Sequence, residues 1–201
     1  MYGEQLAPIV DRAQKLMCNA FREFPFNIVV IYNALNNYGP SALFYPEPTG
    51  YDSTMVGFPY DDVDRWRHIY PLDVFKEQFK RLSEGWKRGL DVLEATKSEG
   101  EQYNELLSMS RVACCRFASA YNHVRFVTTR DELAKTPNSG ELLKEIKLVI
   151  ENEQELTVML MKECAKDSRI GFEASNHYYY TQQELKEKLL NLKFCESFFG
   201  I

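Results

Sequence analysis

The 201-residue sequence lacks the charge pattern of a nucleic-acid-binding protein and the apolar stretch of a membrane protein. It contains no run of lysine or arginine, and its formal net charge is −5, so it has no basic footprint for phosphate backbones. No apolar stretch approaches the about 20 residues that cross a bilayer. The opening residues are charged and periodic, unlike a signal peptide. We therefore expect no nucleic-acid partner, no membrane partner and a cytoplasmic location.

The sequence also lacks the usual motifs that hold metals or carry catalysis. Its cysteines form no C-x-x-C pair and its histidines no H-E-x-x-H motif, so neither a disulfide framework nor a metal site is predicted. A G-x-S-x-G elbow, a phosphate-binding glycine loop and a dinucleotide fingerprint are all missing. We predict no cofactor and no catalysis by this chain alone, which leaves open whether it belongs to an enzyme.

What is present is an ordinary globular composition, 45% hydrophobic and 26% charged. Apolar residues recur at three- and four-residue steps over most of the chain, which is the period of amphipathic helices. We predict a mainly α protein, an up-down helical bundle of about four to five helices in a single domain, 1–201. Its parts are a first helix within 1–24, a long irregular segment rich in proline, glycine and aromatic residues at 25–72, and a helical bundle at 73–201.

Two helix starts have the spacing of a capping box, in which a Ser or Thr and a Glu satisfy free backbone amides. The first box joins Ser98 to Glu101, and the second joins Thr181 to Glu184. They predict one helix that begins at Ser98 and a short final helix after Thr181.

The segment that follows the first helix is expected to be irregular. Residues 24–70 contain five prolines, three glycines and many aromatic residues. Prolines and glycines at this density interrupt helices and strands, which argues against long regular elements. Within it, NIVVIYNA is compatible with either a short strand or a helical turn, and TMVGF favours a brief extended piece.

One candidate site lies in GFPYDDVDRWRHIYP, residues 57–71. A sugar site uses carboxylates and guanidinium groups for charged hydrogen bonds to hydroxyls, and a planar indole for stacking. The candidate residues are Tyr60, Asp61, Asp62 and Trp66. The alternative is that the same groups pin a long loop to the bundle through ion pairs. A calcium loop is excluded, because the sixth residue counted from Asp62 is Arg67 and not glycine.

A second candidate site lies in GFEASNHYYYTQQEL, residues 171–185. It places Glu173, Asn176, His177 and Tyr178 directly before the predicted final helix. So many hydrogen-bonding and aromatic groups favour a loop that contacts a ligand, and the alternative is a polar turn before a helix.

The long middle helix carries a polar face beside its apolar stripe. Arg116, Ser119, His123 and Arg130 recur there at helical spacing. Charged groups close to a core are costly unless they are paired. We therefore expect these side chains to contact carboxylates of the chain itself or a ligand.

Four stretches, in order along the chain, resemble the C-terminal helix-rich portion of large bacterial proteins related to glycoside hydrolases. In that family a TIM-barrel catalytic region precedes such a portion, so the resemblance implies catalytic carboxylates outside this chain. It also implies that the two candidate loops face the same side. The stretches are FREFPFNIVVIYNALNNYGPSALFYPEPTGYDSTMVGFPYDD, LSEGWKRGLDVLE, CCRFASAYNHVRFVTTRDEL and DSRIGFEASNHYYYTQQELKEKLLN.

The resemblance implies a helical accessory domain that packs on a catalytic barrel and contributes to a carbohydrate pocket. If this chain is part of an enzyme, that enzyme is then a glycoside hydrolase. The alternative function is a non-catalytic protein-interaction or scaffold bundle with no sugar ligand. An apolar patch left by an absent barrel would favour self-association, so we expect a homodimer over a monomer.

Overall fold

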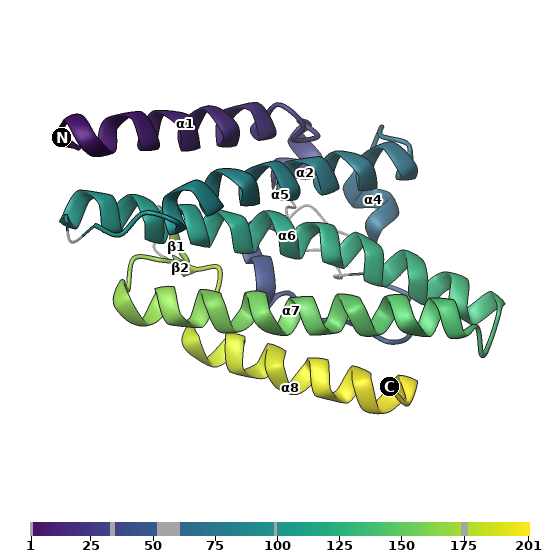
Figure 1. The fold of residues 1–201 in the computed structure, drawn as a ribbon. Coiled ribbons are helices and arrows are strands. Elements are labelled where there is room, and N and C mark those ends of the chain that lie inside the picture. The colour runs from purple at the N-terminus through teal and green to yellow at the C-terminus, as the bar shows by residue number, and fades with distance from the viewer. Residues whose placement is uncertain (1, 33–34, 52–60, 99, 174–176) are drawn as a thin grey trace.

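A computed structural model describes residues 2–32, 35–51, 61–98, 100–173 and 177–201 of the chain. It is mainly helical, as the periodicity predicts, and successive long helices run antiparallel (Figure 1). The long helices are α1 (Gly3–Phe21), α5 (Leu72–Glu94), α6 (Glu101–Lys135), α7 (Gly140–Lys166) and α8 (Gln182–Phe199).

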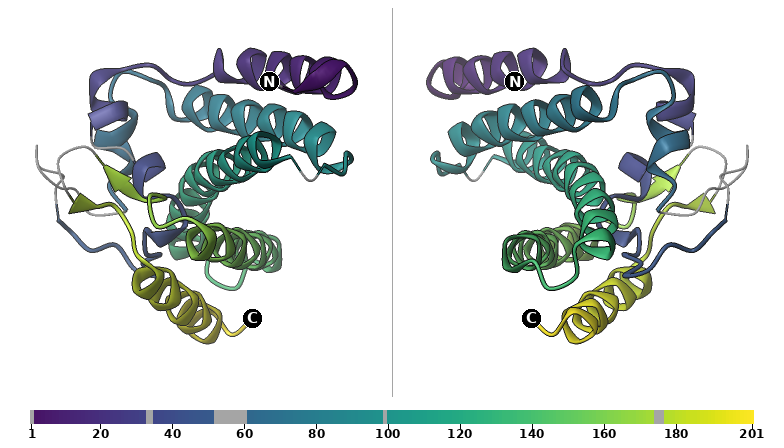
Figure 2. Two further views of the ribbon diagram at one scale, coloured as in Figure 1. Left: turned by 90° about the vertical axis from the view of Figure 1, so that its left-hand side faces the viewer. Right: turned by 90° about the vertical axis from the view of Figure 1, so that its right-hand side faces the viewer.

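The long helices lie in one curved row, in the order α1, α5, α6, α7, α8 (Figure 2). The central helix α6 packs against α5 on one side and α7 on the other, while α1 covers α5 and α8 covers α7. The short elements of the chain all lie on one side of this row. Helix α6 therefore has an inner face toward the short elements and an outer face between α5 and α7.

The segment at 25–72 differs from the predicted irregular loop. Its described residues form several short helical elements, so NIVVIYNA begins as a helix and not as a strand. The predicted extended piece at 54–58 lies outside the described residues. The elements are α2 (Ile28–Tyr32), α3 (Leu35–Tyr38), the 3-10 turn η1 (Gly39–Ser41) and α4 (Val63–Arg67).

This segment supplies a large part of the core. Val30, Leu35, Phe44 and Trp66 are almost completely buried, and they belong to one cluster with apolar side chains of α5, α6, α7 and α8. The Phe44 ring stacks on Phe126 of α6 at 4.2 Å between centroids. Phe44 and Trp66, two of the aromatic residues that made the segment stand out, are therefore core residues, whereas Phe26 and Tyr51 are exposed.

Local sequence explains several of the helix ends. The capping box at Thr181 is confirmed, with its hydroxyl accepting from the Glu184 amide and the Glu184 carboxylate accepting from the Thr181 amide. The box predicted at Ser98 is wrong. Helix α6 starts three residues later, and the Ser98 hydroxyl accepts from the Gly100 amide instead. The last helix is also longer than predicted, at 18 residues.

A small antiparallel hairpin joins α7 to α8, and the sequence pattern did not indicate it. Its strands are β1 (Phe172–Glu173) and β2 (His177–Tyr178), paired as Phe172 with Tyr178 and Glu173 with His177. Gly171, just before β1, has φ +89°, and a Cβ there would lie 2.7 Å from the Tyr180 carbonyl oxygen. Only glycine fits this turn without strain.

Two glycines allow α1 and α5 to approach closely. A Cβ added to Gly85 would lie 2.6 Å from the Ala20 Cβ, and one added to Gly89 would lie 2.9 Å from the Ala13 carbonyl oxygen. Both distances are shorter than van der Waals contact. The small residues of the two helices therefore set their spacing.

We expect Gly85→Ala to lower the free energy of unfolding by about 1–2 kcal/mol, because overpacking costs more than the gain in helix propensity. Gly140→Ala is the matched control, since no atom lies within 4 Å of its added Cβ, and it should be neutral or stabilising. Urea unfolding measures both. A Gly85→Ala protein as stable as the control would contradict the close contact.

Candidate functional site

Trp66 belongs to the core and not to a ligand site. Its side chain is buried, with the residue 1% exposed, and its indole Nε1 donates to the Val30 carbonyl at 3.3 Å. One ring face stacks on Phe79, at 5.2 Å between centroids, and Phe75 packs edge-on. The predicted stacking of this indole on a sugar is therefore wrong, because both the ring and its polar atom are already used inside the fold.

The two aspartates beside Trp66 also have structural partners. The Asp61 side chain is 6% exposed, lies 3.4 Å from an Arg130 guanidinium nitrogen and accepts from the Thr49 amide and hydroxyl at 2.7 and 2.8 Å. Asp62 caps α4 by accepting from the Arg65 amide. These contacts match the alternative interpretation, in which the loop is pinned to the bundle. Tyr60 lies outside the described residues.

The second candidate loop forms the hairpin. The Tyr178 side chain is 47% exposed, and its hydroxyl donates to the Ser168 carbonyl at 3.2 Å while its ring packs on Phe172. Glu173 and His177 are cross-strand partners. Asn176 lies outside the described residues.

The described parts of the two loops do not form one pocket. Helix α4 packs on α2 and on the start of α5, whereas the hairpin follows the end of α7. They lie on the same side of the helical row but far apart along it (Figures 1 and 2). The expectation of a shared carbohydrate pocket is therefore wrong for these residues.

Three of the four residues of the polar face predicted on α6 are paired internally. Arg116 donates to the Asn37 carbonyl at 2.9 Å, and Arg130 donates to the Tyr45 carbonyl at 2.9 Å. Ser119 donates to the carboxylate of Glu153 at 2.5 Å. Both arginines therefore hold the segment at 25–72 against α6.

A fully buried ion pair between α7 and α8 lies beside this face, in contact with Ser119, and sequence reasoning missed it. Lys188 of α8 and Glu153 of α7 are both 0% exposed, with Nζ 3.6 Å from Oε1. Asn122 also donates to this carboxylate, at 2.9 Å. Lys188 donates to the Ala42 carbonyl, and its ammonium lies 3.6 Å from the centroid of the Phe44 ring.

The ion pair had a sequence signal. Glu153 and Lys188 each interrupt an apolar stripe at core spacing, so both were exceptions to the helical pattern. Burial lowers the pKa of Lys188 to about 8, although the nearby negative charge of Glu153 acts to raise that pKa. The flanking core residues are Val149, Ile150, Leu156 and Leu160 in α7, and Leu185, Leu192 and Cys195 in α8.

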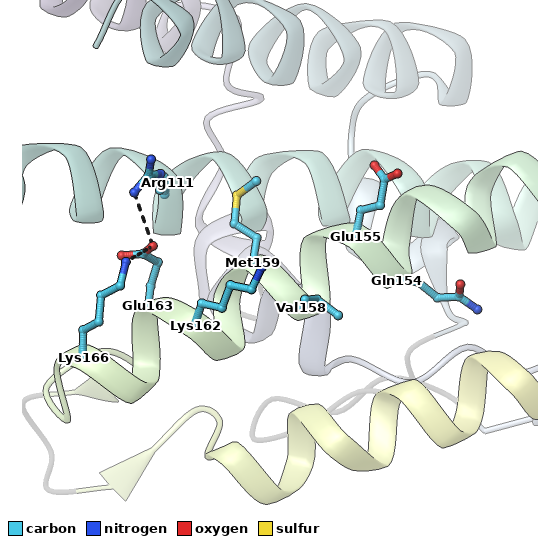
Figure 3. Close-up of a pocket in the computed structure, with 8 residues that line it drawn as sticks. All are labelled: Arg111, Gln154, Glu155, Val158, Met159, Lys162, Glu163 and Lys166. Carbon is cyan, nitrogen blue, oxygen red and sulfur yellow. Dashed lines mark hydrogen bonds and ion pairs between the residues drawn. The ribbon is translucent and has the colours of Figure 1, made fainter. Parts of the chain in front are cut away.

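A concave surface lies over the outer face of α6. We call it the α6 trough, and α5 and α7 form its two walls. It consists of two adjoining concavities of about 560 and about 630 Å³, which share Glu155 and Met159 of α7. Figure 3 shows the one that extends from Gln154 to Lys166. The floor is apolar around Ala118 and Leu156.

The rim of the α6 trough is rich in basic side chains. Six basic and three acidic residues line it, although the chain as a whole carries a net charge of −5. The basic residues are Lys87, Arg88, Arg111, Arg125, Lys162 and Lys166, and the acidic residues are Glu84, Glu155 and Glu163.

Glu163 is occupied by partners within the trough wall. It is almost completely buried and accepts from Ser108 and Lys166 at 2.6 and 2.7 Å, with Arg111 at 3.6 Å. Burial acts to raise the pKa of this carboxyl, but the hydrogen bonds from Lys166 and Ser108 outweigh it and the pKa is lowered. Its charge is therefore compensated locally.

One side chain connects the trough to the buried ion pair. Asn122 lies in the trough floor, donates to Glu153 and to the Asn152 side chain, and accepts from Arg125. The floor is thus held in place from beneath by a hydrogen-bonded network.

A scan against models of known protein families and searches of curated proteins and of solved structures each found no match. Within the described ranges, no helix is long and apolar enough to cross a membrane, and no group of three or more His, Cys, Asp or Glu side chains is placed to hold a metal ion. The resemblance to glycoside-hydrolase-like proteins therefore stays a prediction.

We expect Lys188→Met to lower the free energy of unfolding by about 3–5 kcal/mol, because it leaves the Glu153 carboxylate buried without its counter-charge. Adding Glu153→Gln should restore part of this loss, since the amide removes the buried charge and keeps one acceptor oxygen for Ser119 or Asn122. A double-mutant cycle from urea unfolding measures the coupling. Strictly additive effects would contradict a buried pair.

Stability should also depend on alkaline pH through Lys188. The folded pKa of about 8 lies below the unfolded value of 10.5, so the cost of burying the ammonium is fully present below pH 8 and is relieved between pH 8 and 10.5. Relative to Lys188→Met/Glu153→Gln, the wild type should gain up to about 3 kcal/mol across that range. A constant difference would contradict this pKa.

Proposed function

We propose that this chain is a helical interaction domain that binds one amphipathic helix of a partner in the α6 trough. The observation that supports this is the trough itself, an elongated concave surface with an apolar floor between two helical walls. Helix-in-groove binding uses this combination of an apolar floor and a polar rim.

The dimensions of the trough suit a helix. Its α7 wall runs from Asn152 to Lys166, which corresponds to about 21 Å or four helical turns. Helices α5 and α7 each pack along α6 and not along one another. A further helix laid over α6 would complete a four-helix arrangement, in which every helix buries an apolar stripe against its neighbours.

The apolar residues of the trough provide the driving force. Val158 is 40% exposed on the α7 wall, and Leu156, Met159 and Ala118 line the surface beside it. Covering these groups removes apolar surface from water, which is the main favourable contribution in most protein associations. A single helix in a groove of about four turns makes a small interface, which suits a weak or transient complex.

The resemblance to glycoside-hydrolase-like proteins supplies one class of partner. A TIM barrel is surrounded by an outer ring of helices, and one of them could occupy the trough. In that version the chain is an accessory domain that packs on a catalytic barrel. Its proposed contribution to carbohydrate binding has less support, because Asp61 and Trp66 serve the fold.

A labelled 18-residue amphipathic peptide with a leucine stripe and glutamine flanks should bind the full chain, with Kd on the order of 10–100 μM. Ala118→Trp and Val158→Trp should each weaken binding at least tenfold, since the added indole fills the trough. Lys186→Trp on α8 is the control. Fluorescence anisotropy measures Kd, and urea midpoints check folding. Equal binding by all variants would overturn the proposal.

A further inference from the structure

We propose that the helix bound in the α6 trough is acidic, with Asp or Glu side chains on both flanks of its apolar face at the end that lies nearest the start of α6. This inference rests on the proposed function and specifies the chemistry of the partner. It is carried by the charges around the trough and by their positions on opposite walls.

Four of the six basic residues of the trough form internal ion pairs, which join Lys87 to Asp91, Arg125 to Glu145, Arg111 to Glu94 and Lys166 to Glu163. Arg88 and Lys162, by contrast, are exposed and form no ion pair with any residue that the structure describes. These two cations remain available to an anionic partner.

Arg88 and Lys162 lie on opposite walls at a similar level of α6. Trp86, two residues before Arg88, donates to the Ser110 carbonyl. Glu163, next to Lys162, accepts from Ser108. Both walls are therefore in register with residues 108–110 of α6, so a helix in the trough meets a guanidinium on one flank and an ammonium on the other.

The other end of the trough differs in charge. There Glu84 lines the α5 wall, and Arg125 is already paired with Glu145. A helix with carboxylates at only one end therefore has one favoured orientation in the trough, because the reverse orientation would bring its carboxylates toward Glu84. Complementary charges of this kind determine specificity and register more than raw affinity.

The test compares three labelled peptides that share the leucine stripe. They differ only in the flanking residues, which are Glu, Gln or Lys at the end of the peptide that lies nearest the start of α6. We expect the Glu peptide to bind the full chain about tenfold more tightly than the Lys peptide in low salt. The difference should shrink in 0.5 M NaCl, where exposed charges are screened.

A charge-reversed variant provides the second arm. Arg88→Glu/Lys162→Glu should invert the preference, so that the Lys peptide binds more tightly than the Glu peptide. Lys186→Glu/Lys193→Glu on α8 is the matched control, because it makes the same change in net charge at two exposed positions outside the trough. The control should retain the wild-type order.

The outcomes separate the two proposals. Binding of the Gln peptide in the trough without discrimination between Glu and Lys flanks would overturn the acidic partner and leave the interaction function standing. A preference for the Lys peptide in the wild type would do the same. Absence of binding by all three peptides would overturn both, provided that urea unfolding shows a folded chain.

Discussion

The contact between Lys188 and Glu153 is the interaction on which the arrangement of the molecule depends. It joins α8 to α7, and through Ser119, Asn122 and the Ala42 carbonyl it also joins α6 and the segment after η1. Removing two ions from water costs several kcal/mol each, so helix registers that separate the pair are strongly disfavoured. We interpret the pair as a device that selects one packing of these elements.

The position of Phe44 follows from the same network. Its ring lies under the Lys188 ammonium, and its backbone amide and carbonyl are both bonded to the Asn191 side chain at 2.8 Å. An extended piece of chain is thereby fixed against α8 in place of a regular element. This is how a segment with many prolines and glycines fills the inner side of the helical row without forming a long helix of its own.

The two faces of α6 have different roles. The inner face carries the buried polar network, and the outer face forms the floor of the trough, with Asn122 shared between them. A floor that is held rigidly loses little conformational freedom when a ligand covers it. The arginines that stood out as a polar face in the sequence thus support the fold, and the surface proposed for binding lies on the other side of the same helix, around Ala118.

The sequence by itself determined the helical class, the extent of the first helix and the cap at Thr181, because these follow from local periodicity and local hydrogen bonds. Only the tertiary structure decided the roles of Asp61 and Trp66, since the same residue types occur in a sugar-binding site and in a buried contact between a loop and a helix. It also decided the pairing of Glu153 with Lys188 and the trough between α5 and α7. Both depend on residues that are distant in the chain, and their meeting is set by how the helices pack and not by any pattern within one helix.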